Sequence, residues 1–409
     1  MFEYNSSQVV AANPVVKVGL PTVAQAPKPK ERLLFIDNLR LVMIILVVLQ
    51  HAAVTYSGLG SWFYYERAPL DKISFVLFGL FQGLNQAYFM GILFLIAGYF
   101  VPAAYDRKGF GRFVKDRLVR LGIPALIFML LINPFIGYVL LGFQMSSPKP
   151  PFWSAYSAYL TSGNFLSGSG PLWFALALLI FSVIYAVVRL VSGQRSATGS
   201  APVARKISTW QIVLLMAVIA AATFAIRQVY PAGATFMNMQ LGYFAIYIVL
   251  FIVGIAAYRQ GWFSSIDYAY GSKWLKAALP WGLLAFAVIM VGAELSHTAI
   301  ANYNGGWHWQ SAAYATWESF TAVAMSIGLI TLFREKYNQQ SKLVKILSDN
   351  SFAVYVFHAP VLISISLLMA PLALIPIAKF VIVAPLAVSA SFALTYFILR
   401  RVPVLKAVL

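Results

Sequence analysis

The sequence predicts an all-α protein, a polytopic bundle of about ten membrane-spanning helices. Of its 409 residues, 61% are hydrophobic and only 10% are charged, and the mean hydropathy is +0.78. Soluble domains carry roughly 25% charged residues, so this composition excludes an ordinary soluble fold. Apolar stretches of about 20 residues, the length that crosses the hydrocarbon core of a bilayer, recur along the chain.

The predicted organisation has a tail, a membrane domain and a second tail. Residues 1–32 are polar, are interrupted by proline and lack the apolar core of a secretory signal, so a disordered cytoplasmic tail is expected. Residues 33–400 form the transmembrane domain, and residues 401–409 a cytoplasmic C-terminal tail. The apolar windows cover approximately 34–56, 73–101, 118–141, 171–191, 210–227, 240–258, 276–293, 312–333, 350–369 and 376–399.

The basic residues predict the orientation of these helices. Most of the 30 Lys and Arg residues lie at alternate helix ends, and the intervening loops contain few. The positive-inside rule then places both termini in the cytoplasm and loops 142–170 and 294–311 outside. This distribution also accounts for the formal net charge of +18 without a nucleic-acid partner. The bilayer is the expected partner instead.

Few residue types are available for chemistry. Cysteine is absent, which excludes thiolate nucleophiles, disulfides and cysteine-ligated metals. The four histidines are dispersed, and the sequence has no HExxH, P-loop, GxSxG or GxGxxG motif. We therefore expect no metal and no tightly bound cofactor.

Three ionisable residues interrupt the first span, "FIDNLRLVMIILVVLQHAAVTY": Asp37, Arg40 and His51. At about 100° per residue they share a narrow helical stripe, so we expect all three to line one cavity, with His51 about 16 Å beyond Arg40. Asp37 and Arg40 can pair as i,i+3 neighbours, and an interfacial anchoring pair is the alternative. Intramembrane ionisable residues favour function, and an imidazole suits general acid–base catalysis.

These residues carry a resemblance to a known family. Arg40 and His51, spaced Arg-x10-His after "IDNLR", resemble the signature of the acyltransferase-3 family of integral-membrane O-acyltransferases. The resemblance covers nearly all of residues 32–400. It implies a catalytic His51 and transfer of an acyl group, often acetyl, from cytoplasmic acyl-CoA to an external carbohydrate or similar acceptor in a bacterial inner membrane. Further stretches that resemble the family's landmarks, in its order, are "FLIAGYF" (94–100), "RLVR" (117–120), "PLWF" (171–174) and "SFAVYVFHAPVL" (351–362).

The resemblance also points to residues for the acyl-CoA donor. Arg117 and Arg120 lie at i and i+3 on one helix face, and guanidinium groups bind phosphate oxygens well. Positive-inside loops carry such clusters in any case, which is the alternative. His358 and Tyr355, one turn apart, are candidates for the lining of a donor tunnel, against the simpler interpretation of a packed histidine.

Acceptor-binding candidates come from spans predicted to place polar groups near His51. Gln82, Asn85 and Gln86 lie three and four residues apart on the second span, and Glu318 lies in the outer half of the eighth. Trp173 is a further acceptor-binding candidate, because it lies within "PLWF", one of the stretches that resemble the family. Interhelical hydrogen bonding explains the amides about as well. We expect Glu318 or Asn85 to orient His51.

The resemblance therefore implies a non-aminoacyl acyltransferase of the cell envelope that acylates a carbohydrate or glycolipid, with acetyl-CoA or succinyl-CoA as the expected co-substrate. His51 acts either as general base or as a transient acyl carrier, and the sequence does not choose between them. The alternatives are a proton-coupled transporter, since an Asp, Arg and His stripe can form a proton path, and an inactive polysaccharide-export partner on the same bundle.

Overall fold

The computed structural model describes residues 1, 32–66, 68–144, 148–193, 206–296 and 298–403. Within these residues the secondary structure is helical, apart from an isolated antiparallel bridge between Phe236 and Met239. The all-α prediction is therefore confirmed. The helices belong to the compact unit Leu34–Leu409. The predicted tail 1–32 lies outside the described residues except at its two ends, as do residues 404–409 of the predicted C-terminal tail.

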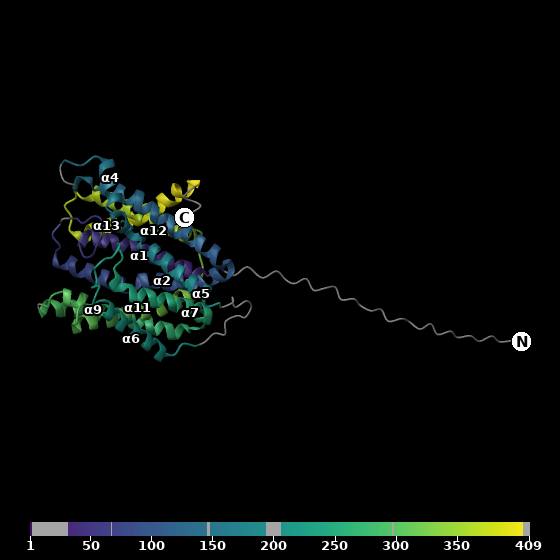
Figure 1. Ribbon diagram of the computed structural model, residues 1–409. Helices are drawn as coiled ribbons and strands as arrows, with labels where there is room; N and C mark the ends of the chain where they lie inside the picture. Colours follow the sequence, from purple (N-terminus) through teal and green to yellow (C-terminus); the bar gives the residue numbers. More distant parts are fainter. Residues whose placement is uncertain (2–31, 67, 145–147, 194–205, 297, 404–409) are drawn as a thin grey trace. The chain divides into compact units, whose positions relative to one another are not determined.

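Long helices are joined by short helical turns (Figure 1). The long helices are α1 (Leu34–Ser57), α2 (Lys72–Arg117), α5 (Trp173–Val191), α6 (Thr209–Ile226), α7 (Phe244–Gln260), α9 (Tyr268–Leu295), α11 (Trp309–Lys336), α12 (Lys342–Met369) and α13 (Pro376–Phe397). The shorter elements are η1 (Leu118–Gly122), α3 (Ile123–Ile127), η2 (Phe128–Ile132), η3 (Phe135–Leu140), η4 (Gly142–Gln144), α4 (Phe152–Thr161), η5 (Asn164–Ser167), η6 (Gly170–Leu172), η7 (Leu241–Tyr243), α8 (Trp262–Ser265), α10 (Ala301–Asn304) and η8 (Leu399–Arg401).

The number of membrane-crossing helices agrees with the prediction of about ten. In the described residues, nine helical stretches are long and apolar enough to cross a bilayer, and one of them, Lys72–Leu140, has 69 residues. At 1.5 Å per residue this stretch measures about 100 Å, roughly three times the hydrocarbon thickness. Its backbone leaves the helical conformation at Gly109 (φ 70°, ψ 173°), which divides it into two passes. Two separate windows, 73–101 and 118–141, predicted this division.

Helix α1 lies at the centre of the bundle. It packs against α2, α11, α12 and α13, and it is buried along most of its apolar length, as α11 is. In contrast, few residues of α6 and α9 are buried, as expected of helices that face lipid, and both helices lie at the edge of the bundle in Figure 1. The central position of α1 surrounds its polar residues with protein.

Backbone contact between α2 and α7 tightens the bundle beside α1. A Cβ atom on Gly98 of α2 would lie 2.1 Å from the carbonyl oxygen of Phe251, and one on Gly254 of α7 would lie 2.1 Å from that of Leu95. Only glycine permits this approach, which is the small-residue packing common between membrane helices.

Polar residues placed just before the helices define where several of them begin. The Asp71 carboxylate accepts hydrogen bonds from the backbone N–H and hydroxyl of Ser74 at 2.9 and 2.6 Å. These bonds lower the pKa of Asp71 below its ordinary value. Ser208, Asp267 and Ser341 cap α6, α9 and α12 in the same way, since each accepts from a backbone N–H of the first turn.

Candidate active site

His51 lies near the end of α1 and forms part of a pair of histidines. Its Nδ1 atom is 3.0 Å from Nε2 of His358 on α12, and Nδ1 of His358 is 2.8 Å from the backbone carbonyl oxygen of Tyr355. His358 is fully buried, whereas His51 is half-buried. The indole of Trp62 stacks on His51, with ring centroids 3.8 Å apart and an interplanar angle of 15°.

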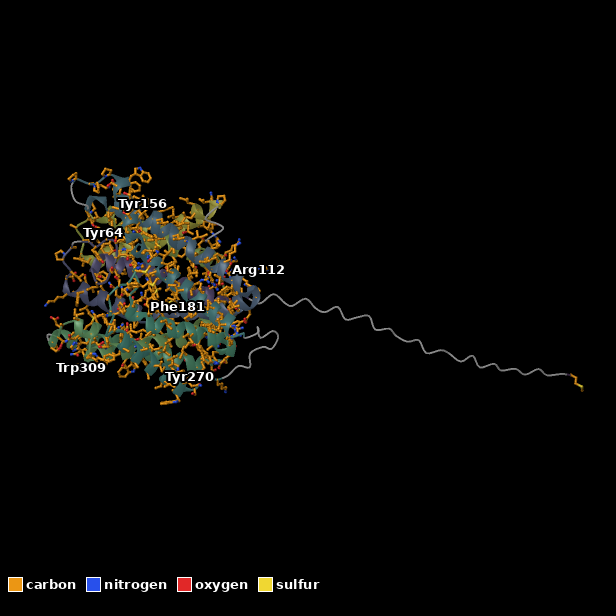
Figure 2. All side chains as sticks on the ribbon, in the orientation of Figure 1. Tyr64, Arg112, Tyr156, Phe181, Tyr270 and Trp309 are labelled. Carbon is orange, nitrogen blue, oxygen red and sulfur yellow. The ribbon has the colours of Figure 1, made fainter. Side chains whose placement is uncertain are left out.

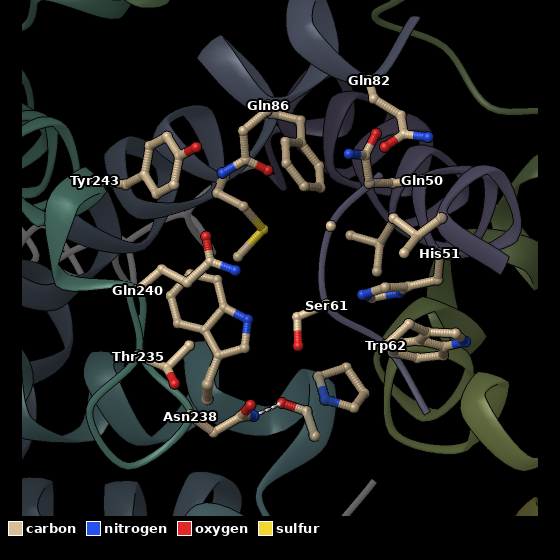
Figure 3. Close-up of a pocket in the computed structure, with 18 of the residues that line it drawn as sticks. Gln50, His51, Ser61, Trp62, Gln82, Gln86, Thr235, Asn238, Gln240 and Tyr243 are labelled. Atoms are coloured by element: carbon tan, nitrogen blue, oxygen red, sulfur yellow. Dashed lines mark hydrogen bonds between the residues drawn. The ribbon is translucent and has the colours of Figure 1, made fainter. Parts of the chain in front are cut away.

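His51 faces a cavity of about 380 Å³, here called the His51 cavity. Figure 3 shows His51 and Trp62 stacked on one side of it, with Gln240 and Tyr243 on the opposite side. Apart from His51 itself, the lining consists of uncharged side chains, many of them amides, hydroxyls and aromatics. Its residues are Val47, Gln50, His51, Val54, Leu59, Gly60, Ser61, Trp62, Phe63, Gln82, Gly83, Gln86, Phe89, Met90, Asn133, Ser167, Gly170, Pro171, Trp173, Thr235, Asn238, Gln240, Tyr243, Tyr247, Tyr314 and Tyr355.

The loop after α1 holds Trp62 in place. The Tyr65 hydroxyl accepts the backbone N–H of Trp62 at 2.6 Å and donates to the carbonyl oxygen of Gly60 at 3.1 Å. The backbone N–H of Glu66 donates to the Thr55 carbonyl oxygen, which ties the loop back to α1. These bonds explain how a loop residue can present a flat ring to His51.

A tight turn at residues 236–239 brings Asn238 to the cavity. Phe236 and Met239 exchange two backbone hydrogen bonds of 2.9 Å, and both central residues, Met237 and Asn238, have positive φ. This geometry is that of a two-residue hairpin, in which Asn is favoured and Met is strained. The Asn238 amide donates to the carbonyl oxygen of Gly170 at 2.7 Å, which joins two loops at the cavity wall (Figure 3).

The predicted amides of α2 lie next to the His51 cavity. Gln82 and Gln86 line it and donate to the Ser57 hydroxyl at 2.7 Å and the Tyr247 hydroxyl at 3.3 Å. Asn85 lies behind the lining and donates to Gln50 at 2.9 Å. Trp173, at the start of α5, also lines the cavity, as does Tyr355, whose hydroxyl donates to the carbonyl oxygen of Pro171.

Glu318 forms a buried ion pair rather than contacting His51. Its Oε2 atom is 2.6 Å from Arg227 Nη2, and both side chains are 0% exposed. The Arg227 guanidinium lies 5.0 Å from the ring centroids of Tyr243 and Tyr314, which line the cavity. The expectation that Glu318 or Asn85 orients His51 is therefore wrong, because His358 occupies that position.

Asp37 and Arg40 form the expected i,i+3 pair. Arg40 Nη2 lies 2.9 Å from Asp37 Oδ1, and the Arg40 side chain is 38% exposed. Neither residue lines the His51 cavity. We expected Asp37, Arg40 and His51 to line one cavity, and for the His51 cavity this expectation is wrong. Eleven residues, roughly 16 Å of helix, separate Arg40 from His51, and the loops that enclose the cavity cover only the end of α1 near His51.

The four predicted donor residues lie at two different places: His358 and Tyr355 lie beside His51, whereas Arg117 and Arg120 lie toward the opposite end of the helices. Figure 2 shows Tyr64 at the cavity end and Arg112 at the other. Arg120 is 68% exposed and lies 3.4 Å from Asp116, and the Arg117 guanidinium lies over the ring of Phe113. No group of three or more His, Asp or Glu residues able to hold a metal occurs in the described part of the chain.

The sequence analysis did not predict several residues that lie at or beside the His51 cavity. Trp62, Asn238 and Gln240 lie in loops, where no helical periodicity marks them. The sequence could have indicated that Arg227 pairs with Glu318. Arg227 lies at the end of α6, at the same predicted depth in the membrane as Glu318, and charged residues within membrane helices usually pair.

These observations define a polytopic membrane protein whose interior histidine pair opens onto an uncharged polar cavity. A family model described as an acyltransferase domain, that of the acyltransferase-3 family, matches residues 33–396. The chain therefore belongs to this family, as the sequence predicted.

Curated relatives agree with this assignment. The chain is 29% identical over 246 residues to glucans biosynthesis protein C of Salmonella schwarzengrund (strain CVM19633) and 28% identical to that of Salmonella heidelberg (strain SL476). Each match covers 58% of this chain and 60% of the relative, so the chain spans less than two thirds of their length. No solved structure matches the chain.

Proposed function

We propose that the protein moves an acyl group from cytoplasmic acyl-CoA to a hydroxyl group of an extracytoplasmic carbohydrate, with His51 at the reaction centre. The observation that carries the proposal is the half-buried imidazole of His51, which faces a cavity of amides, hydroxyls and aromatic rings. The donor is acetyl-CoA or succinyl-CoA.

The cavity lining supports a carbohydrate acceptor. Asn and Gln amides both donate and accept hydrogen bonds, as sugar hydroxyls do, and Gln86 and Asn238 are among those present. The indole of Trp173 adds a large, rigid surface with a polar edge at the cavity wall. The name of the relatives, glucans biosynthesis protein, agrees with a sugar polymer as acceptor.

The chemistry requires one proton acceptor at the reacting hydroxyl. His51 removes the hydroxyl proton, the hydroxyl oxygen attacks the thioester carbonyl carbon, the carbon–sulfur bond breaks, and the departing CoA sulfur takes the proton back. In the covalent variant, a ring nitrogen of His51 attacks the thioester carbonyl carbon and the carbon–sulfur bond breaks to release CoA thiolate. The acceptor oxygen then attacks the acyl carbon, the bond to the His51 nitrogen breaks, and the hydroxyl proton goes to the CoA thiolate. Both routes use the ring atom of His51 that faces the cavity.

The proposed binding site for the acyl-CoA donor lies at the end of the helices opposite the His51 cavity. Arg117 and Arg120 belong to a basic group with Lys108 near the predicted cytoplasmic surface. Guanidinium groups match phosphate oxygens, so the nucleotide portion of acyl-CoA is assigned there, with its thioester arm extending past Arg40 toward His51.

Mass spectrometry of cell-envelope glycans tests the proposed function. Cells that express the wild-type protein should contain a defined acyl mass on a glycan, and cells that express His51→Ala should lack it, which identifies acyl group and acceptor together. His308→Ala provides a matched control, because His308 is exposed and lies outside the cavity. An unchanged glycan profile in His51→Ala cells would contradict the proposal.

Reconstituted vesicles separate this function from transport. A transferase consumes acyl-CoA thioester when acceptor is present, whereas a proton-coupled transporter accumulates solute without thioester cleavage. Uptake with intact thioester would favour the transporter.

Cysteine labelling tests the proposed orientation in the inner membrane, since the natural chain contains no cysteine. Trp307→Cys and Tyr337→Cys place single thiols at the two ends of α11, at side chains 84% and 53% exposed. With both termini cytoplasmic, a membrane-impermeant maleimide labels the first variant in intact spheroplasts and the second only after lysis. The reverse pattern would contradict this orientation.

A further inference from the structure

The contact between His51 and His358 determines which nitrogen of each ring carries hydrogen. A backbone carbonyl oxygen can only accept a hydrogen bond. The 2.8 Å contact between His358 Nδ1 and the Tyr355 carbonyl therefore requires a hydrogen on Nδ1 of His358. In a neutral ring, Nε2 of His358 is then an acceptor.

The same reasoning extends to His51. Its Nδ1 atom lies 3.0 Å from Nε2 of His358, so it must donate the hydrogen of that bond. A neutral His51 then carries its lone pair on Nε2, the remaining ring nitrogen. The lone pair needed for the proposed reaction is thus assigned to one atom.

We infer that His358 is a positioning residue: it selects the Nδ1–H tautomer of His51 and so directs the reactive Nε2 lone pair into the cavity. The inference rests on the proposed function for its catalytic meaning, although the tautomer itself is a property of the resting protein. The orienting partner in a Ser-His-Asp triad has the same task, performed there by a carboxylate.

A neutral histidine suits this position better than a carboxylate. His358 is fully buried in a helix that packs against α1 within the bundle. A lone carboxylate there would be a buried charge in the resting enzyme, which is costly in a membrane interior. When Nε2 of His51 takes the acceptor proton, the positive charge is shared through the Nδ1 hydrogen bond to His358. His358 gains no proton over the complete reaction, since the proton on Nε2 leaves with the CoA sulfur.

Nitrogen NMR of histidine-labelled protein in lipid bilayers measures the tautomer directly. We expect both rings to carry hydrogen on Nδ1, with the signals assigned by their loss in His51→Ala and His358→Gln proteins. A wild-type His51 with its hydrogen on Nε2 would overturn the inference. This readout is independent of turnover, so it decides the inference even if wild-type protein transfers no acyl group and the proposed function fails.

Two substitutions at residue 358 then separate positioning from packing. His358→Leu removes the acceptor, and we expect the Nδ1–H signal of His51 to be lost and kcat to fall roughly 100-fold with KM little changed. His358→Gln retains a side-chain carbonyl near the position of Nε2, and kcat should recover to within about 10-fold of wild type. Ser366→Ala, at another buried polar residue of α12, is the matched control with unchanged kcat.

Thermal unfolding in detergent confirms that each variant is folded. Equal kcat values for the folded Leu and Gln variants would overturn the inference, as would a wild-type tautomer in the Leu variant.

Discussion

The two ends of the helices carry polar groups of different kinds. Around His51 the cavity is lined by amides, hydroxyls and aromatic rings. Toward the opposite end, charged side chains gather in ion pairs: Asp37–Arg40, Lys108–Asp116, Arg120–Asp116, Arg189–Asp106 and Arg259–Asp106.

The difference follows from the cost of removing charge from water. Several charged groups at the opposite end are partly exposed, so their desolvation cost is small and their pairing contributes little. Most residues of the cavity wall are buried or half-buried, and there the neutral groups form hydrogen bonds instead. Two pairs depart from this pattern. The nearly buried pair Lys379–Glu66 includes a residue of the loop after α1, and the pair Arg227–Glu318 is fully buried beside the cavity.

The largest expected effect comes from breaking that buried pair. Arg227→Met leaves Glu318 as an unpaired buried charge, and we expect the free energy of unfolding to fall by roughly 3–5 kcal/mol. Thermal unfolding in detergent measures it. The double variant Arg227→Met/Glu318→Met should recover most of the loss. A single variant as stable as wild type would show that water reaches Glu318.

A smaller effect is expected from an amide in the cavity lining. Gln86→Leu removes hydrogen-bonding groups that face the proposed acceptor, so KM for the acceptor should rise about 10-fold. The loss should appear in acceptor titrations and not in acyl-CoA titrations. Asn350→Leu offers a comparison at a buried amide outside the cavity. Equal effects on both titrations would indicate a general structural role for Gln86.

Arg40 tests the comparison at the end of the helices opposite the cavity, where charged side chains are partly exposed. Because its side chain is 38% exposed, Arg40→Gln should change the free energy of unfolding by less than about 1 kcal/mol. Acyl-CoA consumption should nevertheless fall if Arg40 contacts the donor, as the family resemblance implies. Stability and thioester cleavage are measured on the same preparation. Wild-type cleavage in this variant would restrict Arg40 to anchoring the helix.

The smallest effect is expected at an exposed pair in α12. Lys345 and Asp349 are i,i+4 neighbours 2.6 Å apart, and the Lys345 side chain is 58% exposed. Lys345→Gln should cost roughly 0.3–0.5 kcal/mol of stability and leave acyl transfer unchanged. High salt should reduce even this difference. A loss beyond 1 kcal/mol would show that exposed pairs here contribute more than the comparison assumes.

Much of the fold was predictable because the bilayer restricts the possible structures. A chain that crosses hydrocarbon must satisfy its backbone hydrogen bonds within helices, so apolar windows of the right length give helix positions. The window 171–191 corresponds to α5 and 376–399 to α13 with small differences at the ends. The break at Gly109 lies between the predicted windows 73–101 and 118–141, because a helix needs only about 20 residues to cross the hydrocarbon once.

The candidate site was predictable only where its residues share a helix. Gln82, Asn85 and Gln86 were recognised together because spacings of three and four place side chains on one helical face. Asp37 and Arg40 pair for the same reason. Trp62 and Asn238 reach the cavity through loop conformations set by several hydrogen bonds, and periodicity carries no information about these.

The sequence by itself determined that this chain crosses the membrane about ten times and that His51 lies on the first helix, because these properties depend on local composition and spacing. Its short motifs carried the resemblance to the acyltransferase-3 family, and acyl transfer is what that resemblance implies. Only the tertiary structure decided that His51 contacts His358, 307 positions away, and that Glu318 pairs with Arg227, 91 positions away. Helix packing brings such partners together, and it depends on the shapes of many side chains at once.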